Sequence, residues 1–565
     1  MYKELQETWS ELTAKDAAFE IAKVEVRGEK IKAYVNAPSS LRDVWLMSQQ
    51  FADRDYLVYQ DERWTYARAH KEVASIAAWL RSQGIGPGDR VAIAMRNYPE
   101  WLLTYWACTS QGIAAVGMNA WWIAPEMAYA LKDSNPKLMV CDQERLDRFS
   151  EIQDSFSDLT IVGVRTTSEH ANVIPFSELT ETEAALPDAD VQPDDDACIF
   201  YTSGTTGNPK GAQLTHRGCV NNLMNLAFSA AVFPTAVARF KNVELPNPED
   251  APIGSALITT PLFHVTANNC LAHGNTLTGG KLIHMYRWDA GEALRLIEKE
   301  KITSVSGVPT MSREILAHPD FEKYDTSTLL TLGGGGAQLQ PDLVAKIDKA
   351  VATARPNTGF GMTETCGIIT SISGDFFVDK PDSCGPAMPN FETKCIDSEG
   401  AEVAIGEVGE LLVKGAPVIK GYINRVEATA ESIIDGWLHT GDVARIDEHG
   451  FIFIVDRVKD MVLRGGENIY CAEVESIIYN MPDIAECSVF GVDDDRLGEE
   501  VGVAIVLKDG SSSTAADIRE FCLKHGAKHK APRYIWVLDE SLPRNANGKF
   551  LKRELKKILD PSIAK

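Results

Sequence analysis

The sequence lacks the cysteine patterns of secreted and zinc-binding proteins. Its eleven cysteines are scattered along 565 residues, with no CxxC pair and no regular spacing. Structural zinc sites usually use such closely spaced pairs, and disulfide-stapled domains are short and cysteine-dense. An odd, unpatterned set in a chain of this length is typical of a reducing compartment, so we expect a cytoplasmic protein.

Long hydrophobic runs and positive charge are also scarce. The first twenty residues contain no apolar signal core, and no window approaches the ~18 uninterrupted apolar residues that suggest a membrane-spanning helix. The 56 Lys and Arg against 80 Asp and Glu give a net charge of −24, which argues against general binding to nucleic acids or anionic membranes. One region departs from this average, because Arg519–Lys557 carries eleven Lys or Arg against four Asp or Glu. The sequence therefore does not exclude contact of this basic region with a membrane surface.

The order of apolar patterns predicts more than one domain. A chain of 565 residues exceeds what one hydrophobic core usually supports. Buried-strand and helix patterns alternate from residue 70 to 164, and the same alternation returns from 253 to 304. Such alternation predicts two α/β units with largely parallel sheets. Between them, residues 229–252 mix small residues, prolines and charges, and this composition predicts an insertion or a mobile loop.

The pattern changes twice in the last third of the chain. From Gly385, short strands separated by glycine turns predict antiparallel, barrel-like β structure, and after Asp456 helices and strands mix again. The predicted fold class is therefore α/β. We expect a large N-terminal domain at 1–455, made of two α/β subdomains and a β-barrel-like one, a hinge at 456–460, and a small mobile α+β C-terminal domain at 461–565.

The stretch YTSGTTGNPKG, Tyr201–Gly211, has the composition of a phosphate-binding loop. It is not a Walker A loop, because Pro209 precedes the lysine and Gly211 replaces the metal-binding hydroxyl. Glycines that permit positive φ, exposed backbone N–H groups, hydroxyls and a lysine can still surround phosphate oxygens. A flexible surface turn is the common alternative for such a composition. The cradle would comprise Ser203, Gly204, Thr205, Thr206, Gly207 and Lys210.

The same loop resembles the signature of the adenylate-forming superfamily, which includes acyl-CoA synthetases, firefly-type luciferases and peptide-synthetase adenylation domains. The other blocks of that family follow in order, so the resemblance covers nearly the whole chain. They are GGGGA (333–337), GFGMTET (359–365), GELLVKG (409–415), WLHTGDVARID (437–447), DRVKDMVLRGGENIY (456–470) and PRNANGK (543–549). The chain is most similar in these blocks to the acyl-CoA synthetase, or fatty-acid–CoA ligase, branch.

The resemblance implies an ATP- and Mg²⁺-dependent activation of a carboxylic acid, followed by transfer to coenzyme A. Each nucleotide contact follows from a matched motif position. Thr202 and the loop through Lys210 would hold the β- and γ-phosphates, and Glu364 with Thr205 would hold the metal. Thr363 would lie on the α-phosphate. The adenosine would meet Gly336, Ala337, Gly359, Phe360, Asp442 and Arg457, with Phe360 stacking on adenine and Asp442 accepting from the ribose.

Four further positions concern the reacting groups and the moving domain. Lys549 matches the lysine that bridges the attacking carboxylate and the α-phosphate, and His264 matches a gate between the acid site and the acceptor tunnel. Lys459 matches the hinge about which the C-terminal domain rotates. That rotation would bring Gly465 and Gly466 to the pantetheine tunnel. The alternative for Lys549 is a solvent-exposed lysine at the start of a basic helix, and the match to PRNANGK outweighs it.

The acid itself is predicted only by class. Glycines dominate the expected pocket and no fixed cation is evident for a second carboxylate, which favours an apolar monocarboxylate. We expect a medium- or long-chain fatty acid, and hence a role in lipid metabolism, with an aryl or alicyclic acid as the alternative. Transfer to an acyl carrier protein or a small amine, and a non-catalytic nucleotide-binding module, are the rival functions. We expect a monomer or homodimer without a nucleic-acid partner.

Overall fold

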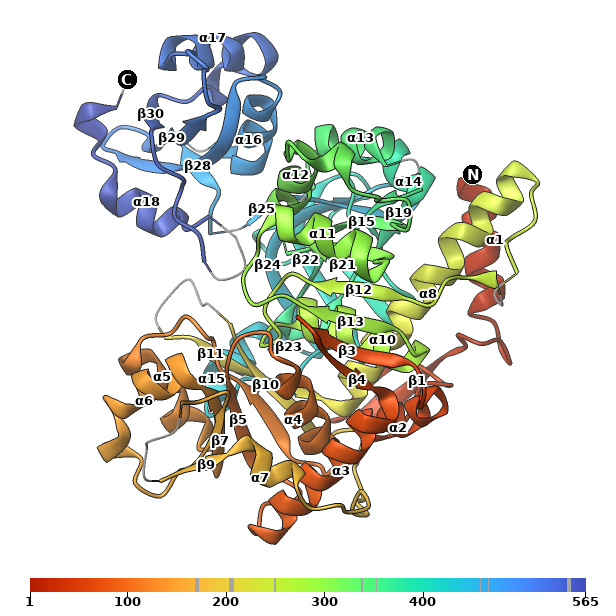
Figure 1. Ribbon diagram of the computed structural model, residues 1–565. Coiled ribbons are helices and arrows are strands. Elements are labelled where there is room, and N and C mark those ends of the chain that lie inside the picture. Colours follow the sequence, from red (N-terminus) through yellow and green to blue (C-terminus); the bar gives the residue numbers. More distant parts are fainter. Residues whose placement is uncertain are drawn as a thin grey trace.

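The computed structural model describes residues 1–167, 172–202, 208–247, 250–336, 339–351, 353–457, 459–465, 467–545 and 550–564. Two largely parallel sheets and an antiparallel sheet form a large body, and the C-terminal residues form a small domain on one side of it (Figure 1). This arrangement confirms the predicted α/β class with a large N-terminal and a small C-terminal part. The borders at 455 and 460 stay predictions.

The first sheet has the strand order β11-β10-β6-β5-β7-β8-β9. Its strands are parallel except for β11, which runs antiparallel to β10. The strands are short runs of buried Val, Ile, Ala and Cys, as expected for a sheet covered on both faces. Their bounds are β5 (Arg90–Ala94), β6 (Ala114–Gly117), β7 (Leu138–Asp142), β8 (Thr160–Val164), β9 (Val173–Pro175), β10 (Asp196–Thr202) and β11 (Lys210–Thr215). The covering helices are α3 (Tyr66–Ser82), α4 (Pro99–Thr109), α5 (Ala124–Ser134), α6 (Gln143–Ser150) and α7 (Phe176–Thr180).

The second sheet has the order β19-β16-β15-β14-β12-β13-β3-β4. Two of its strands, β3 (Asp55–Tyr59) and β4 (Glu62–Thr65), precede the first sheet in the chain, and β3 pairs in parallel with β13. The others are β12 (Ser255–Ile258), β13 (Lys281–His284), β14 (Ser304–Gly307), β15 (Thr331–Gly334), β16 (Arg355–Thr358) and β19 (Ile372–Ser373). Its helices include α10 (His273–Thr278), α11 (Ala290–Glu300), α12 (Pro309–Ala317) and α13 (Pro341–Ala350).

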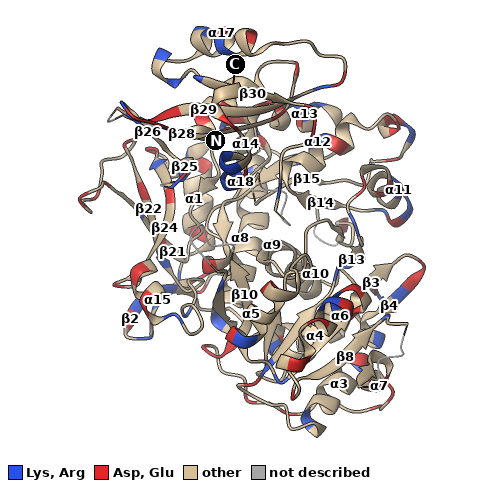
Figure 2. Cartoon of the chain, turned by 90° about the vertical axis from the view of Figure 1, so that its left-hand side faces the viewer, with Lys and Arg blue, Asp and Glu red and all other residues tan. Residues whose placement is uncertain are grey.

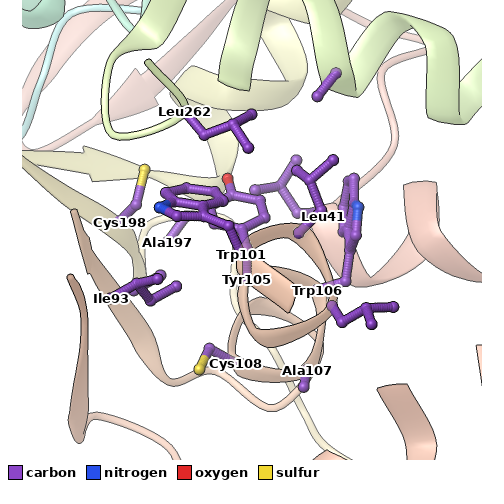
Figure 3. Packing of buried hydrophobic residues seen from close by; sticks show 14 of the residues in the cluster. Leu41, Ile93, Trp101, Tyr105, Trp106, Ala107, Cys108, Ala197, Cys198 and Leu262 are labelled. Atoms are coloured by element: carbon purple, nitrogen blue, oxygen red, sulfur yellow. The ribbon is translucent and has the colours of Figure 1, made fainter. Parts of the chain in front are cut away.

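Helix α4 forms the centre of the core between the two sheets. All eleven of its residues are buried, which suits a helix that is apolar on every side. Trp101 stacks on Tyr105 with ring centroids 5.4 Å apart, and Trp106 donates a hydrogen bond to the Tyr56 hydroxyl at 2.8 Å (Figure 3). Because Tyr56 lies on β3 and Ala197 and Cys198 of β10 face the same cluster, this packing joins the two sheets into one body.

The predicted loop or insertion at 229–252 is largely helical, so the loop prediction was wrong for residues 229–241. They are the second half of α8 (His216–Lys241), which contains Pro234 and buries Phe228, Val232 and Phe233. Helix α1 (Tyr2–Leu12) packs beside it, with Trp9 edge-on to Phe228 at 4.6 Å. Among the described residues, α8 is the one helix long and apolar enough to cross a membrane by length and composition, and half of its most apolar stretch is buried inside the fold.

The third sheet is antiparallel and has the order β20-β25-β24-β22-β21, with β23 beside β24. Its strands are β20 (Gly385–Pro386), β21 (Phe391–Ile396), β22 (Val408–Gly415), β23 (Ile433–Ile434), β24 (Trp437–Ile446) and β25 (Phe451–Arg457). The small domain has its own core around β28 (Ile484–Asp494), β29 (Gly498–Leu507), β30 (Tyr534–Leu538), α16 (Cys471–Tyr479) and α17 (Ala515–His525). Its last long helix, α18 (Lys552–Ile558), carries Lys and Arg (Figure 2).

Candidate functional site

Glu364 lies in a short turn, Thr363–Thr365, between the two-residue strands β17 (Gly361–Met362) and β18 (Gly367–Ile368). Its side chain is buried, and its Oε1 accepts a hydrogen bond from the Tyr422 hydroxyl at 2.8 Å. Burial raises the pKa of Glu364, while the Tyr422 hydrogen bond and the positive charges of Arg457 and Lys210 act in the opposite direction. The turn therefore presents one buried carboxylate, and the charges of Arg457 and Lys210 favour its ionised form.

Lys210 reaches the same place from β11. The strand pairing sets Lys210 opposite Thr202 at the ends of β11 and β10, and the Thr202 hydroxyl lies 3.4 Å from the Lys210 carbonyl oxygen. The Lys210 ammonium lies 4.9 Å from the centre of the Tyr422 ring. Tyr422 thus contacts both charged groups, with its hydroxyl on Glu364 and its ring under Lys210. The predicted phosphate-binding residues Ser203, Gly204, Thr205, Thr206 and Gly207 lie outside the described residues.

Asp442 and Arg457 face each other on the antiparallel strands β24 and β25. The Arg457 Nε lies 3.3 Å from Asp442 Oδ1, and Asp442 is buried while Arg457 is largely exposed. An ionised carboxylate with a second oxygen can accept further hydrogen bonds from ribose hydroxyls. Because Arg457 also acts on the Glu364 pKa, the ribose-site candidate and the metal-site candidate belong to one electrostatic cluster.

Glycines form a narrow wall near the ends of β15 and β16. Gly334 and Gly336 have φ of 150° and 82°, and a Cβ on Gly334 would lie 1.8 Å from the Gly307 carbonyl oxygen. A Cβ on Gly359 would lie 2.6 Å from the Thr370 carbonyl oxygen. Phe360, next to it, is half-buried, and its N–H donates to the Thr370 hydroxyl at 3.1 Å. These glycines are therefore required by close backbone packing between neighbouring segments, and Phe360 lies next to them. Ala337 lies outside the described residues.

His264 follows β12 and lies against Phe263, with ring centroids 4.7 Å apart. Its Nε2 is buried and has no hydrogen-bond partner in the described part of the chain. Burial lowers the pKa of His264 to about 4, so the imidazole is neutral at pH 7. A neutral ring with an unused nitrogen can lie beside an uncharged acyl group without the cost of burying a cation.

The predicted positions beyond Arg457 are only partly described. Lys459 is exposed just after β25, and Gly465 follows β26 (Val462–Arg464) with φ of 60°, its N–H donating to the Leu497 carbonyl at 2.7 Å. Gly466 and Lys549 lie outside the described residues. The structure thus brings together Lys210, Glu364, Asp442 and Arg457, and its fold sets Thr202 beside Lys210 and Thr363 beside Glu364.

The side chains of the site show whether it could hold the Mg²⁺ that the resemblance implies. No group of three or more His, Cys, Asp and Glu side chains in the described ranges could hold a metal ion. Mg²⁺ often takes only one or two protein carboxylates and completes its shell with water and substrate phosphates. A single carboxylate, Glu364, therefore fits a phosphate-bound Mg²⁺ better than a metal held by protein ligands alone.

Three supporting residues had not been singled out from the sequence. Tyr422 carries no local pattern, because its contact with Glu364 spans 58 residues of chain. Asn269 donates to the Cys366 carbonyl oxygen at 2.9 Å, and Asn222 accepts from the Ile368 N–H at 2.9 Å. The available signal for the asparagines was their position inside apolar helical stretches, where a buried amide needs a partner.

Comparisons with known proteins agree along nearly the whole chain. The model of the AMP-binding enzyme family matches residues 45–423, and that of the AMP-binding enzyme C-terminal domain matches residues 473–549. The chain is 35% identical over 496 residues to "Feruloyl-CoA synthase" of Amycolatopsis sp, covering 87% of this chain and 93% of the relative. It is 32% identical over 518 residues to a "2-succinylbenzoate–CoA ligase" of Bacillus cereus, covering 91% and 98%.

A solved structure shows the same architecture. The o-succinylbenzoate CoA synthetase of Bacillus subtilis, in complex with its acyl-adenylate intermediate, superposes with a TM-score of 0.73 at 29% identity. The match covers 91% of this chain and 97% of that one.

Proposed function

The chain belongs to the AMP-binding enzyme family, and from that premise we propose that it is an acid–thiol ligase acting on an aryl carboxylic acid, ATP and coenzyme A. In the first step a carboxylate oxygen forms a bond to the α-phosphorus of ATP, and pyrophosphate leaves. In the second step the CoA thiol attacks the acyl carbonyl and loses its proton, and AMP leaves. The relatives named above support this sequence, since one was solved with an acyl-adenylate and two are named as CoA synthase or CoA ligase.

The cluster around Glu364 carries the first step of the proposal. Attack of one anion on another requires positive charge and oriented donors near the phosphates. Mg²⁺, when bound, supplies part of that charge, and Glu364 is the residue that would hold it. Lys210 and Arg457 supply two fixed cations around the same carboxylate, and Asp442 fixes the ribose end. Their positions are set by paired strands, so little reorganisation is needed when the nucleotide binds.

The relatives support an aryl or alicyclic acid, which was the alternative prediction, rather than the fatty acid that we expected first. Feruloyl and succinylbenzoyl groups both carry an aromatic ring, and neither name denotes a fatty acid. An aryl or alicyclic acid is therefore better supported than a medium- or long-chain fatty acid, and a role in lipid metabolism has no support among these relatives. The neutral His264 beside Phe263 suits an apolar acyl group.

The remaining predicted roles complete the proposal. Lys549 would neutralise charge between the attacking carboxylate and the α-phosphate in the first step. Residues 461–565 would then rotate about Lys459, removing Lys549 and bringing Gly465 and Gly466 to the pantetheine of CoA. Thr363 would contact the α-phosphate, and the Thr202–Lys210 loop the β- and γ-phosphates. ATP, Mg²⁺ and CoA are thus the small molecules that the reaction requires.

A panel of acids tests the proposal. Benzoic, cinnamic and hydroxycinnamic acids are compared with alicyclic acids and with fatty acids of six to sixteen carbons, each with and without CoA, and AMP and thioester are separated by chromatography. We expect an aryl acid to give CoA-dependent thioester with kcat/KM at least ~10-fold above any fatty acid, since a rigid ring loses less conformational freedom on binding than a flexible chain. Preference for a fatty acid would overturn the aryl assignment. Acid-dependent AMP release without CoA consumption would instead identify a different acceptor.

A further inference from the structure

The two ends of the predicted phosphate-binding loop lie against one helix, α5, which packs beside β10 and β11 (Figure 1). Before the loop, the Tyr201 hydroxyl donates a hydrogen bond to Asp133 Oδ2 at 3.0 Å. After it, the Pro209 carbonyl oxygen accepts one from the Tyr129 hydroxyl at 3.0 Å. Tyr129 and Asp133 occupy positions i and i+4 of α5, so they lie one turn apart on the same face of the helix. Helix α5 therefore contacts the chain on both sides of the loop.

Arg425 joins these two contacts. Its Nη2 donates to the Tyr129 hydroxyl at 2.7 Å and lies 3.3 Å from Asp133 Oδ1. The hydrogen bond with Tyr129 and the charge of Asp133 raise the pKa of Arg425, so this side chain stays a cation. The Asp133 side chain is only 6% exposed, and its carboxylate depends on protein donors such as Arg425 and Tyr201 in place of water.

The hydrogen bonds form a directed chain from a cation to the end of the loop. The Tyr129 hydroxyl accepts from Arg425 and donates its own proton to the Pro209 carbonyl oxygen. Donation by a charged group polarises the hydroxyl and strengthens the bond that the hydroxyl donates in turn. The charge of Arg425 therefore acts on the loop through Tyr129.

The segment that carries Arg425 also carries Tyr422. Its main chain lies along β11, where the N–H of Ile423 donates to the Gly211 carbonyl oxygen at 2.8 Å. The Tyr422 hydroxyl donates to Glu364, the candidate metal ligand. One short segment thus supports both the carboxylate of the metal-site candidate and, through Arg425, the chain on both sides of the phosphate-binding loop.

We propose that Tyr129, Asp133 and Arg425 are positioning residues that clamp the two ends of the phosphate-binding loop. They act through the chain on either side of the loop rather than on the nucleotide. A loop loses conformational freedom when it closes around a ligand, and fixed ends reduce that loss. The clamp therefore favours binding of the β- and γ-phosphates of ATP, and of pyrophosphate in the reverse step. The inference rests on the proposed function and adds the residues that prepare the loop for ATP.

The two half-reactions distinguish a clamp from general support of the fold. In Tyr129→Phe and Arg425→Gln we expect the KM for ATP to rise about tenfold, since a hydrogen bond assisted by a charge is lost. Thioester formation from supplied acyl-adenylate and CoA should stay unchanged, because an acyl-adenylate carries no β- or γ-phosphate. Tyr66→Phe is the matched control, since its hydroxyl also donates to a main-chain carbonyl, that of Gly280 at 2.8 Å, and it should leave the KM for ATP unchanged. Equal losses in both steps by the clamp variants would overturn the proposal.

A double variant tests whether the residues act as one unit. Because Arg425 acts on the end of the loop through Tyr129, the Tyr129→Phe/Arg425→Gln protein should raise the KM for ATP by no more than about twofold beyond Arg425→Gln alone. Independent effects would multiply to about 100-fold relative to the wild type. That result would contradict the chain from Arg425 through Tyr129 to Pro209.

Calorimetric titrations separate this inference from the proposed function, because they need no acid. With Mg²⁺, the affinity of Tyr129→Phe for adenosine 5′-(β,γ-imido)triphosphate should fall about tenfold, while its affinity for AMP should equal that of the wild type. Equal losses for both nucleotides, or no loss for either, would overturn the clamp. If the wild type binds both nucleotides and shows this difference but forms no thioester with any acid, the proposed function fails and the clamp is supported.

Discussion

At the scale of single residues, the chemistry depends on how the charge of Glu364 is controlled. Its burial opposes ionisation, and the hydroxyl of Tyr422 is the hydrogen-bond donor that acts directly on the carboxylate. A metal-binding carboxylate must be ionised, so proton binding competes with the metal. The acidic limb of the pH–rate profile should therefore report this one group.

Replacement of Tyr422 by Phe should move that acidic limb to higher pH. Loss of the hydrogen bond removes a contribution that lowers the pKa of Glu364, so the carboxylate is protonated at a higher pH and activity is lost earlier as pH falls. At pH 6 we expect a loss of about tenfold in acid-dependent pyrophosphate exchange, with a smaller loss at pH 8. Tyr34→Phe is the control, since it removes a buried hydroxyl bonded to Asn225. A pH-independent loss would contradict this role for Tyr422.

At the scale of elements, two buried asparagines hold the turn that carries Glu364. Asn222 on α8 accepts from the Ile368 N–H, and Asn269, in the π-helical turn Asn268–Ala272, donates to the Cys366 carbonyl. The backbone between these contacts is conformationally demanding, because Cys366 has φ of 54° and Gly367 has φ of 145°. Fixing both sides of such a turn positions the carboxylate before the nucleotide binds.

Replacement of Asn269 by Ala should weaken metal use more than stability. We expect the Mg²⁺ concentration for half-maximal exchange to rise about tenfold, with an unchanged KM for the acid, because one fixed contact to the turn is lost. Asn225→Ala provides the comparison, since Asn225 is buried one turn beyond Asn222 on α8 and contacts Tyr34 instead. Mn²⁺ binding in the presence of a non-hydrolysable ATP analogue, followed by electron paramagnetic resonance, should show the same difference. Equal effects of the two substitutions would indicate a purely structural role.

Two phenylalanines test whether the second half of α8 packs as a helix against the core. Phe233 is 1% exposed and Phe240 is 53% exposed on the same helix. Phe233→Ala should lower the free energy of unfolding by about 3–5 kcal/mol, because it leaves a cavity in the core. Phe240→Ala should change it by less than about 0.5 kcal/mol. Similar small effects in denaturant unfolding would mean that residues 229–241 do not pack as a helix in solution.

The helices and strands that could be predicted are those whose apolar pattern is visible within a few consecutive residues. Residues 90–94 and 255–258 form strands of parallel sheets that are covered on both faces. Such strands are continuous apolar runs, and this pattern can be recognised in the sequence alone. Residues 229–241 were predicted as a loop because they contain Pro234 and small residues. They form a helix whose apolar side chains are buried against α1 and the second sheet. The pairing of β3 with β13 and the contact of Tyr422 with Glu364 join distant segments, so no local pattern could predict them. The ATP-site candidates could be predicted because each lies in a motif that resembles one of the family's sequence blocks.

At the scale of the whole molecule, the mechanism that we propose includes a movement of the small domain. Asp456, the last residue but one of β25, accepts a hydrogen bond from the N–H of Cys471, the first residue of α16. The large body is therefore tied to the small domain through a buried carboxylate. Burial raises the pKa of Asp456 to about 6. This contact joins the first residue of the predicted hinge at 456–460 to the small domain, and a rotation about Lys459 would have to break or remake it.

A rigid hinge should separate the two half-reactions. Lys459→Pro restricts φ at the predicted pivot, so we expect pyrophosphate exchange near the wild-type rate and thioester formation reduced at least ~10-fold. Lys459→Ala, which keeps the backbone free, should retain both activities within a few-fold. The second step is measured by supplying a synthetic acyl-adenylate and CoA. Equal loss in both steps would argue against rotation about this residue.

The central claim is that the cluster around Glu364, together with Lys549, lets a carboxylate attack the α-phosphorus of ATP. Exchange of labelled pyrophosphate into ATP, with Mg²⁺ and an aryl acid, measures that step most directly. We predict acid-dependent exchange by the wild type, at least ~100-fold slower exchange by Glu364→Gln and Lys549→Ala, and retained thioester formation by Lys549→Ala from supplied acyl-adenylate. Absence of acid-dependent exchange by the wild type with every organic acid tried would contradict the account.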